Sequence, residues 1–319
     1  MTPRRARGVV LLHALIVVSV LAAVAAATVR DGLDDRYRYG LMLRSDQAAH
    51  HARSAEAAAV ALLAADAAAT GLDHLGEAWA EPRSFTLDGA RVTVRLEDLQ
   101  GRLNVNALVR RDEGDGRPVL AVVEPLFSIL ERLAQEAGAA PQAATRLVEW
   151  TADGVDGLTG AAGDRPYLRR EPPLLRPAQP ILSVQALRPV GGLTPDSFAR
   201  LRPSLTALPK ATAINVNTAP LPVLRALLPG LRSRALDRLD ADRRDAPFDS
   251  VVAFQNYAAA RFPPILTDAL GTVPLAVKTE WFLLRTDVQT DTMALRIYSV
   301  LHRPYDDPGS VILRSFAPS

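Results

Sequence analysis

Cysteine is absent from this chain of 319 residues. Its absence excludes disulfide scaffolds, thiolate zinc sites, iron–sulfur clusters and cysteine nucleophiles. An excess of one charge sign is also missing, because 37 Lys and Arg face 35 Asp and Glu. The composition is therefore not that of a polyanion binder. Hydrophobic residues make up 48% of the chain, which is enough to bury a core and excludes disorder as the main state.

The common enzyme motifs are missing as well. We find no His-Glu-x-x-His, no Gly-x-Ser-x-Gly, no P-loop and no Gly-x-Gly-x-x-Gly after a predicted strand. His50 and His51 are neighbours on a predicted helix, so their side chains point about 100° apart and form a poor metal pair. The sequence therefore predicts a protein that is not an enzyme.

Charged residues are absent between Gly8 and Val29. At 1.5 Å per residue this stretch covers about 30 Å, the thickness of the hydrocarbon layer, so it predicts a transmembrane helix over residues 9–29. The flanking charges set its orientation by the positive-inside rule. Residues 1–8 are expected in the cytoplasm and everything after Arg30 across the membrane, because basic residues precede the span and acidic residues follow it: Arg4, Arg5 and Arg7, then Asp31, Asp34 and Asp35.

A cleaved secretory signal peptide is the alternative explanation of this N-terminus. The basic start, the apolar run and the Ala-x-Ala patterns around residues 24–27 are compatible with it. Two features disfavour it. The apolar run exceeds the usual 7–15 residues of such a signal, and residues 31–69 continue without proline and with high helix propensity. We expect one helical rod of about 60 residues.

The short basic leader ends at Gly8 and is followed directly by VVLLHALIV. This pattern resembles the leaders of type IV pilins and type II secretion pseudopilins. The resemblance implies that a prepilin peptidase cleaves after Gly8 and methylates Val9. Most pilins have glutamate as the fifth mature residue, whereas this chain has His13. The family that typically lacks this glutamate is the minor pseudopilin called general secretion pathway protein K.

The rest of the chain alternates between strand and helix patterns. A hairpin is predicted around Asp88-Gly89, and three strands are predicted at 278–288, 292–303 and 310–316. About 170 proline-punctuated residues between them have helical periodicity. We expect an α+β fold, in which a pilin-like long N-terminal helix packs on an antiparallel sheet with a large inserted α-helical domain. The expected parts are a leader (1–8), a transmembrane part (9–29), a periplasmic helix with first strands (30–106), the inserted domain (107–276) and C-terminal strands (277–319).

Three phrases also resemble the protein K family. QGRLNVNAL at 100–108 leads into the predicted insertion, and DGVDGLTGAAGDRPY at 153–167 and INVNTAPLPVLRALLPGL at 214–231 lie within it. The resemblance implies a minor pseudopilin that caps the tip of the periplasmic pseudopilus and helps initiate its assembly for protein export. The implied partners are minor pseudopilins I and J, other pseudopilus and inner-membrane platform subunits, prepilin peptidase, the inner membrane and secreted proteins.

The second phrase is an acidic, glycine-rich loop that offers Asp153, Asp156 and Asp164. Calcium binds six to eight oxygens in flexible geometry, which carboxylates and turned carbonyls can supply. The loop is not an EF-hand, because Val155 and Gly157 occupy its third and fifth positions. The resemblance implies calcium on the three aspartates, although Gly163 replaces a glutamate of the family. A solvated acidic loop is the alternative.

The third phrase and the residues after it also resemble a helix–hairpin–helix module, which suggests a membrane-anchored DNA-binding protein as the alternative function. Six arginines favour it: Arg225, Arg232, Arg234, Arg238, Arg243 and Arg244. Four aspartates in the same stretch cancel their field, so a structural role is favoured and no nucleic acid is expected: Asp237, Asp240, Asp242 and Asp245. Asn215 and Asn217 are then predicted to form a turn and cap a helix.

Overall fold

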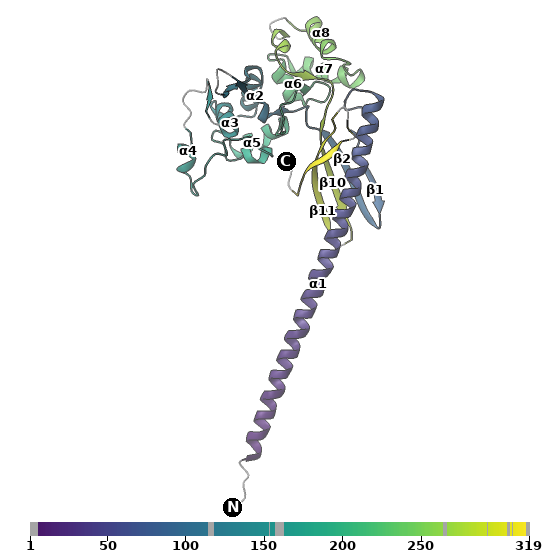
Figure 1. The fold of residues 1–319 in the computed structure, drawn as a ribbon, viewed down its shortest axis with the longest axis vertical. Coiled ribbons are helices and arrows are strands. Elements are labelled where there is room, and N and C mark those ends of the chain that lie inside the picture. Colours follow the sequence, from purple (N-terminus) through teal and green to yellow (C-terminus); the bar gives the residue numbers. More distant parts are fainter. Residues whose placement is uncertain are drawn as a thin grey trace, which may run out of the picture.

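The computed structural model describes residues 6–113, 118–152, 154–156, 163–263, 267–291, 293–304, 307 and 309–316. Its longest element is α1 (Ala6–Ala69), one unbroken helix of 64 residues. The lower part of α1 projects from the rest of the molecule as a rod, and its upper part lies along a sheet (Figure 1). The predicted rod is confirmed, and the absence of proline allows it to continue without a kink.

The upper part of α1 packs through small side chains. Its buried apolar positions recur every three or four residues, which places them on one face of the helix: Ala48, Ala52, Ala55, Ala59 and Leu63. Four of these five side chains end at Cβ, so the helix backbone approaches the sheet closely. The large apolar residues between Leu11 and Val29 are instead more than half exposed.

The sheet has five strands in the order β1-β2-β10-β11-β12, and every neighbouring pair is antiparallel. The strands are β1 (Arg83–Leu87), β2 (Ala90–Asp98), β10 (Trp281–Gln289), β11 (Ala294–His302) and β12 (Ser310–Ser315). The predicted hairpin is confirmed. Asp88 and Gly89 both have positive φ, at 48° and 80°, as the tight turn between twisted strands requires.

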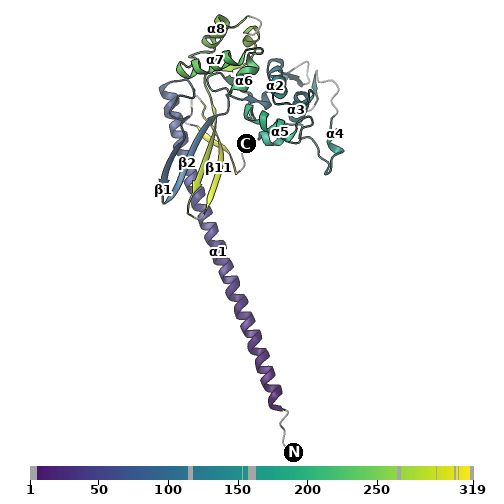
Figure 2. The same ribbon diagram turned by 180° about the vertical axis from the view of Figure 1, so that it is seen from behind.

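A helical domain is inserted between β2 and β10 and lies beside and above the sheet (Figures 1 and 2). Its buried apolar residues form one core that extends from Leu103 to Val277. The helices are α2 (Glu124–Glu136), α3 (Ala143–Thr151), α4 (Arg165–Leu168), α5 (Pro195–Leu201), α6 (Leu221–Leu227), α7 (Ser233–Asp245) and α8 (Val251–Arg261).

Short strands support these helices, and the sequence patterns did not predict them. β4 (Val109–Glu113) and β5 (Pro118–Val122) form a hairpin, and β6 (Val155–Asp156) pairs with β5. Two parallel pairs bring distant segments together: β3 (Leu103–Asn104) with β7 (Leu205–Thr206), and β8 (Ile214–Asn215) with β9 (Leu275–Ala276). The strands of these two parallel pairs have only two residues each, which is too short to show a strand periodicity.

Candidate functional site

Asn104 and Asn106, the first Asn-x-Asn pair, fasten the beginning of the helical domain to its middle. The Asn104 side-chain amide donates to the Lys210 carbonyl at 2.8 Å, and its oxygen accepts from the Leu208 amide at 3.1 Å. Asn106 donates to the Ile181 carbonyl at 2.8 Å and accepts from the Ile181 amide at 3.0 Å. Each asparagine side chain thus forms hydrogen bonds with backbone groups of a loop that lies at least 75 residues away in the sequence. These backbone groups would otherwise lack partners.

Asn215 and Asn217, the second pair, do the same where the helical domain meets the sheet. The buried Asn215 amide nitrogen lies 3.0 Å from the Asp73 carbonyl, the Asp98 Oδ2 and the Thr279 hydroxyl. Asn217 exchanges two hydrogen bonds with the backbone of Phe248, both at 2.9 Å. The predicted turn is present, because Asn215 Oδ1 accepts from the Asn217 amide.

The predicted capping role of these asparagines was wrong. Helix α6 begins after Pro220, which occupies the N-cap position without a side-chain hydrogen bond. Asn215 and Asn217 instead hold segments that lie far apart in the sequence. Sequence reasoning missed this role because hydrogen-bond partners more than 30 residues away leave no local pattern.

Asp98, at the end of β2, is the acceptor at the centre of this contact. Its Oδ2 accepts from the hydroxyls of Thr218 and Thr279 at 2.5 Å and 2.6 Å, and its Oδ1 accepts from the Gln100 amide at 2.6 Å. Burial raises the pKa of Asp98, partly opposed by these hydrogen bonds. The donors come from both the sheet side and the helical domain, so Asp98 joins the two.

Gly101 lies at the point where the phrase QGRLNVN meets the phrase INVNT. A Cβ on Gly101 would lie 2.8 Å from the Thr218 carbonyl oxygen and 2.8 Å from its hydroxyl. No Cβ atom can come this close to another heavy atom. One of the two contacted atoms, the carbonyl oxygen, belongs to the backbone and cannot move aside easily. The two phrases therefore pack directly against each other, and glycine permits that approach.

A second buried group, the junction cluster, comprises Asp66, Asp73, Glu77 and Arg303. Nη2 of Arg303 lies 2.7 Å and 2.8 Å from the two Asp73 carboxylate oxygens, and Nη1 lies 3.7 Å from Asp66 Oδ2. Glu77 accepts from the Trp79 indole at 2.7 Å. The three carboxylates lie close enough to hold a metal ion, but the Arg303 guanidinium already supplies the positive charge among them. The geometry assigns this cluster a structural role.

Burial is the main cause that raises the pKa of Asp66 to about 6, and the Glu77 charge adds to it. Burial also raises the pKa of Asp73 to about 6, although Arg303 opposes the shift. The ordinary value is 3.8 for both groups. The folded protein therefore binds more protons than the unfolded chain between these values, so the carboxylates favour folding at low pH and lose that contribution as pH rises through about 6.

We expect the full chain in detergent to melt at a higher temperature at pH 5.5 than at pH 7.5, with Asp73 alone contributing about 1 kcal/mol to the difference. Asp66→Asn should reduce this difference, because the amide cannot titrate. Asp164→Asn is the matched control and should keep it, since hydrogen bonds from Arg176 hold the pKa of Asp164 below its usual range. A melting temperature that rises with pH in the unmodified protein contradicts the assignment.

Glu56 provides a second anchor for α1. Its buried carboxylate accepts from the Ser299 hydroxyl on β11 at 2.6 Å and from Arg314 on β12 at 2.8 Å. These bonds satisfy a charge that would otherwise be costly to bury against the alanine face of the helix. Together with the junction cluster, they fix the position of α1 on the sheet.

The acidic loop with the three predicted calcium ligands is described only at its ends. Asp153 lies outside the described residues, and Asp156 has its backbone in β6. Asp164 precedes α4, where its Oδ1 accepts from the Arg176 side chain at 3.0 Å and from the Arg176 amide at 3.2 Å. Both contacts use the same oxygen. The Asp164 carboxylate is therefore paired with the Arg176 guanidinium.

Comparisons with known proteins agree with this arrangement. The family profile for type II secretion system (T2SS), protein K, matches residues 101–210 in its first domain and 214–272 in its second. The type II secretion system protein K of Pseudomonas aeruginosa is 31% identical, over 98% of this chain and 93% of that protein. The chain belongs to the type II secretion system protein K family.

Two further similarities support the same family. Type II secretion system protein K of Klebsiella pneumoniae is 30% identical over 88% of this chain and 87% of that protein. A solved chain of the GspK-GspI-GspJ complex from enterotoxigenic Escherichia coli superposes with a TM-score of 0.73 and 26% identity, covering 88% of this chain and all of that one. The expected pilin-like fold with an inserted helical domain is confirmed.

In this protein K family member, several arginines of the third phrase and of the residues after it make contacts within the protein. Arg243 is buried and donates to the Val216 and Ala219 carbonyls, both at 2.7 Å. Arg244 pairs with Asp240 at 3.0 Å, and Arg225 pairs with Glu136. Half of the six arginines that favoured a DNA-binding module therefore have protein partners.

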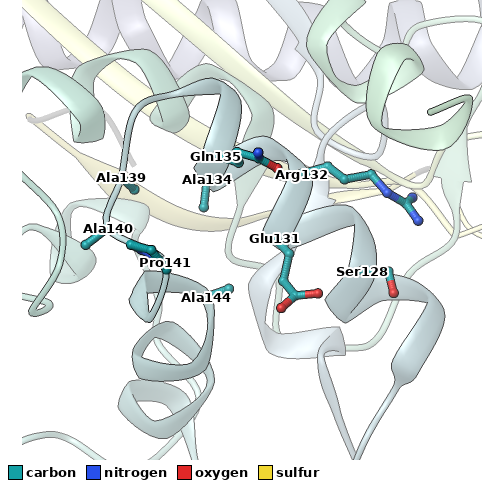
Figure 3. Close-up of a pocket in the computed structure, with 9 residues that line it drawn as sticks. All are labelled: Ser128, Glu131, Arg132, Ala134, Gln135, Ala139, Ala140, Pro141 and Ala144. Carbon is teal, nitrogen blue, oxygen red and sulfur yellow. The ribbon is translucent and has the colours of Figure 1, made fainter. Parts of the chain in front are cut away.

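A cavity of about 410 Å³ lies between α2 and the segment that leads into α3 (Figure 3). Glu131 and Arg132 point in different directions at its wall, and Arg132 donates to the Ala226 carbonyl at 2.7 Å. Within the described part of the chain, no hydrogen bond joins Ser128 or Glu131 to another side chain.

The predicted processing residues Gly8 and Val9 lie near the start of α1, within the continuous helix. His13 follows one turn later, at the beginning of the apolar stretch. The helix from Leu11 onward is long and apolar enough to cross a membrane. The chain thus has the apolar part of α1 at one end and the sheet with the helical domain at the other (Figure 1).

Proposed function

We propose that this protein caps the tip of the periplasmic pseudopilus together with minor pseudopilins I and J, and that it helps initiate pseudopilus assembly. The observation that carries this proposal is the position of the helical domain. It extends sideways from the sheet and above the end of α1 (Figures 1 and 2). A repeating subunit needs that space for the globular domain of the next subunit, whereas a terminal subunit does not.

The charge pattern of α1 supports the same position. His13 stands where most pilins have a glutamate, and no carboxylate occurs between Gly8 and Asp31. A glutamate in the apolar part of a pilin can pair with the N-terminal amine of a neighbouring subunit. A chain without this carboxylate has no such partner to offer, so its place at the end of the filament is consistent with its sequence.

The membrane-spanning part of α1 implies a single-pass protein of the bacterial inner membrane, with residues 1–8 in the cytoplasm and the folded domains in the periplasm. In this proposal prepilin peptidase processes the leader at Gly8 and Val9. The inner-membrane platform subunits then receive the assembled tip, and secreted proteins contact it from the periplasm. These partners follow from the family resemblance and the placement of α1.

Isolation of the pseudopilus tests the tip position. We expect the full chain to co-purify from detergent-solubilised membranes with minor pseudopilins I and J in one complex. An antibody against the helical domain should label one end of each filament. The major pseudopilin is the control and should label the whole length. Labelling of this protein along the filament in proportion to the major subunit, or failure to associate with I and J, contradicts the tip proposal.

We also propose that the loop from Asp153 to Asp164 binds calcium in a structural site. Asp164 and the backbone of Asp156 stand at the two ends of this loop. The full chain should melt at a higher temperature in calcium than in chelator, since a ligand at a hundredfold excess over Kd stabilises the folded state by about 2.7 kcal/mol. Asp156→Ala should shrink the difference, whereas Asp245→Ala on α7 should not. Identical melting in both buffers supports the solvated loop instead.

A further inference from the structure

Helices α7 and α8 lie at the end of the molecule opposite the N-terminus (Figures 1 and 2). Between them are two adjoining hollows of about 360 and 750 Å³, which share Arg238, Asp242, Tyr257 and Arg261. The smaller hollow, which we name the arginine cleft, is completed by Ala235 and Phe262. It is the part of the two hollows in which the positive side chains outnumber the negative one.

The two guanidinium groups of the arginine cleft have no acidic partner. Arg261 lies over the ring of Tyr257, with its Cζ atom 4.0 Å from the ring centroid, so its side chain is held in place by a cation–π contact. Arg238 comes from the facing helix, α7. Among the described residues, no carboxylate oxygen lies within 4.0 Å of a guanidinium nitrogen of Arg238 or Arg261. The cleft is therefore lined by two cations, of which Arg261 is held by the Tyr257 ring and Arg238 is exposed.

The negative group in the arginine cleft is already engaged. The Tyr257 hydroxyl donates to Asp242 Oδ2 at 2.6 Å. Burial and the neighbouring Asp242 raise the pKa of Tyr257 to about 12, so the hydroxyl stays protonated and keeps donating at neutral pH. Asp245 lines only the larger hollow. The single carboxylate that lines the arginine cleft thus already accepts a hydrogen bond from Tyr257.

We propose that the arginine cleft binds a carboxylate group of an acidic polypeptide segment. Arginine guanidinium groups are planar and form paired hydrogen bonds with a carboxylate. The walls formed by Ala235 and Phe262 accommodate the short aliphatic part of a glutamate side chain. The hollow of about 360 Å³ has room for one such side chain. The helices that form it, α7 and α8, lie at the end of the molecule opposite the N-terminus (Figures 1 and 2).

The surrounding charges favour a polypeptide over a nucleic acid. A nucleic acid binds along a continuous track of cations, because its phosphates are evenly spaced. On α7 this track is interrupted, since Asp237 and Asp245 alternate with the arginines. Arg243 is buried against backbone carbonyls, and Arg244 pairs with Asp240. Two guanidinium groups that line one hollow, without such a track, match one carboxylate.

Fluorescence anisotropy with the full chain in detergent tests this proposal. The probe is a labelled peptide of five Glu-Gly repeats, and the matched peptide carries Gln in place of Glu. We expect the acidic peptide to bind and the Gln-Gly peptide not to bind. Arg238→Gln and Arg261→Gln should each weaken the binding about tenfold, as the loss of a charged hydrogen bond predicts. Higher salt should weaken it as well.

Arg234→Gln is the control, because it removes the same charge from an exposed position of α7 outside the cleft. It should leave the affinity within about twofold. The melting temperature of each variant verifies that it is folded. Equal binding of the two peptides, equal losses in all three variants, or tighter binding of a 12-base DNA duplex at the same salt overturns the proposal. The isolated chain is used throughout, so the result does not depend on the tip position.

Discussion

Replacing Arg303 with methionine is expected to lower the free energy of unfolding by about 3 to 5 kcal/mol at pH 7.5, because removal of one partner leaves buried carboxylates without their positive charge. Arg303 is buried between the end of α1 and the sheet, where it contacts Asp73 and Asp66. It also donates to the Leu63 carbonyl at 3.0 Å and the Thr279 carbonyl at 2.7 Å. Methionine fills much of the volume but offers none of these donors.

Chemical unfolding of the full chain in detergent measures this loss. Arg296→Met is the matched control, since Arg296 pairs with Asp287 on the exposed part of the sheet. Its cost should stay below about 1 kcal/mol, as for other surface ion pairs. The loss in Arg303→Met should be smaller at pH 5.5, because the Asp66 and Asp73 carboxyl groups then take up protons. Equal losses in the two variants contradict the importance of the junction cluster.

Gly8→Val is expected to abolish processing and, with it, incorporation into the pseudopilus. A peptidase that recognises glycine before the scissile bond has no room there for a β-branched side chain. The variant then keeps Arg4, Arg5 and Arg7 at the cytoplasmic end of α1. Drawing α1 out of the bilayer into a filament requires those guanidinium groups to enter the hydrocarbon, at a cost of about 2.5 to 3.5 kcal/mol for each at the membrane centre.

Intact mass and N-terminal sequence of the protein isolated from membranes provide the measurement. The unmodified chain should begin at methylated Val9, and Gly8→Val should retain residues 1–8. Ala6→Val, in the same leader, is the control and should be processed normally. An unmodified chain that begins near Thr28 instead indicates a signal peptidase and removes the basis for the pseudopilin leader.

The elements of this protein that the sequence predicts well are those whose formation depends on residues close together in the sequence. The uncharged, proline-free N-terminal stretch predicts α1, because each helical hydrogen bond joins residues four apart. Asp88-Gly89 predicts the first hairpin, because its positive φ angles are a local property. The strand patterns near the C-terminus predict β10, β11 and β12 to within a few residues, since alternation along a strand needs no knowledge of its partner.

The tertiary structure alone decided how these elements are held together. Arg303 meets Asp73 across 230 residues, and Asn215 meets Asp73 across 142. No spacing along the chain predicts such a pair, because the two side chains meet only after the helical domain has folded back onto the sheet. The sequence by itself therefore determined the rod, the strands of the five-stranded sheet and the family. Which charges are buried, and which arginines stay available to a partner, depended on the packing of segments that are distant in the chain.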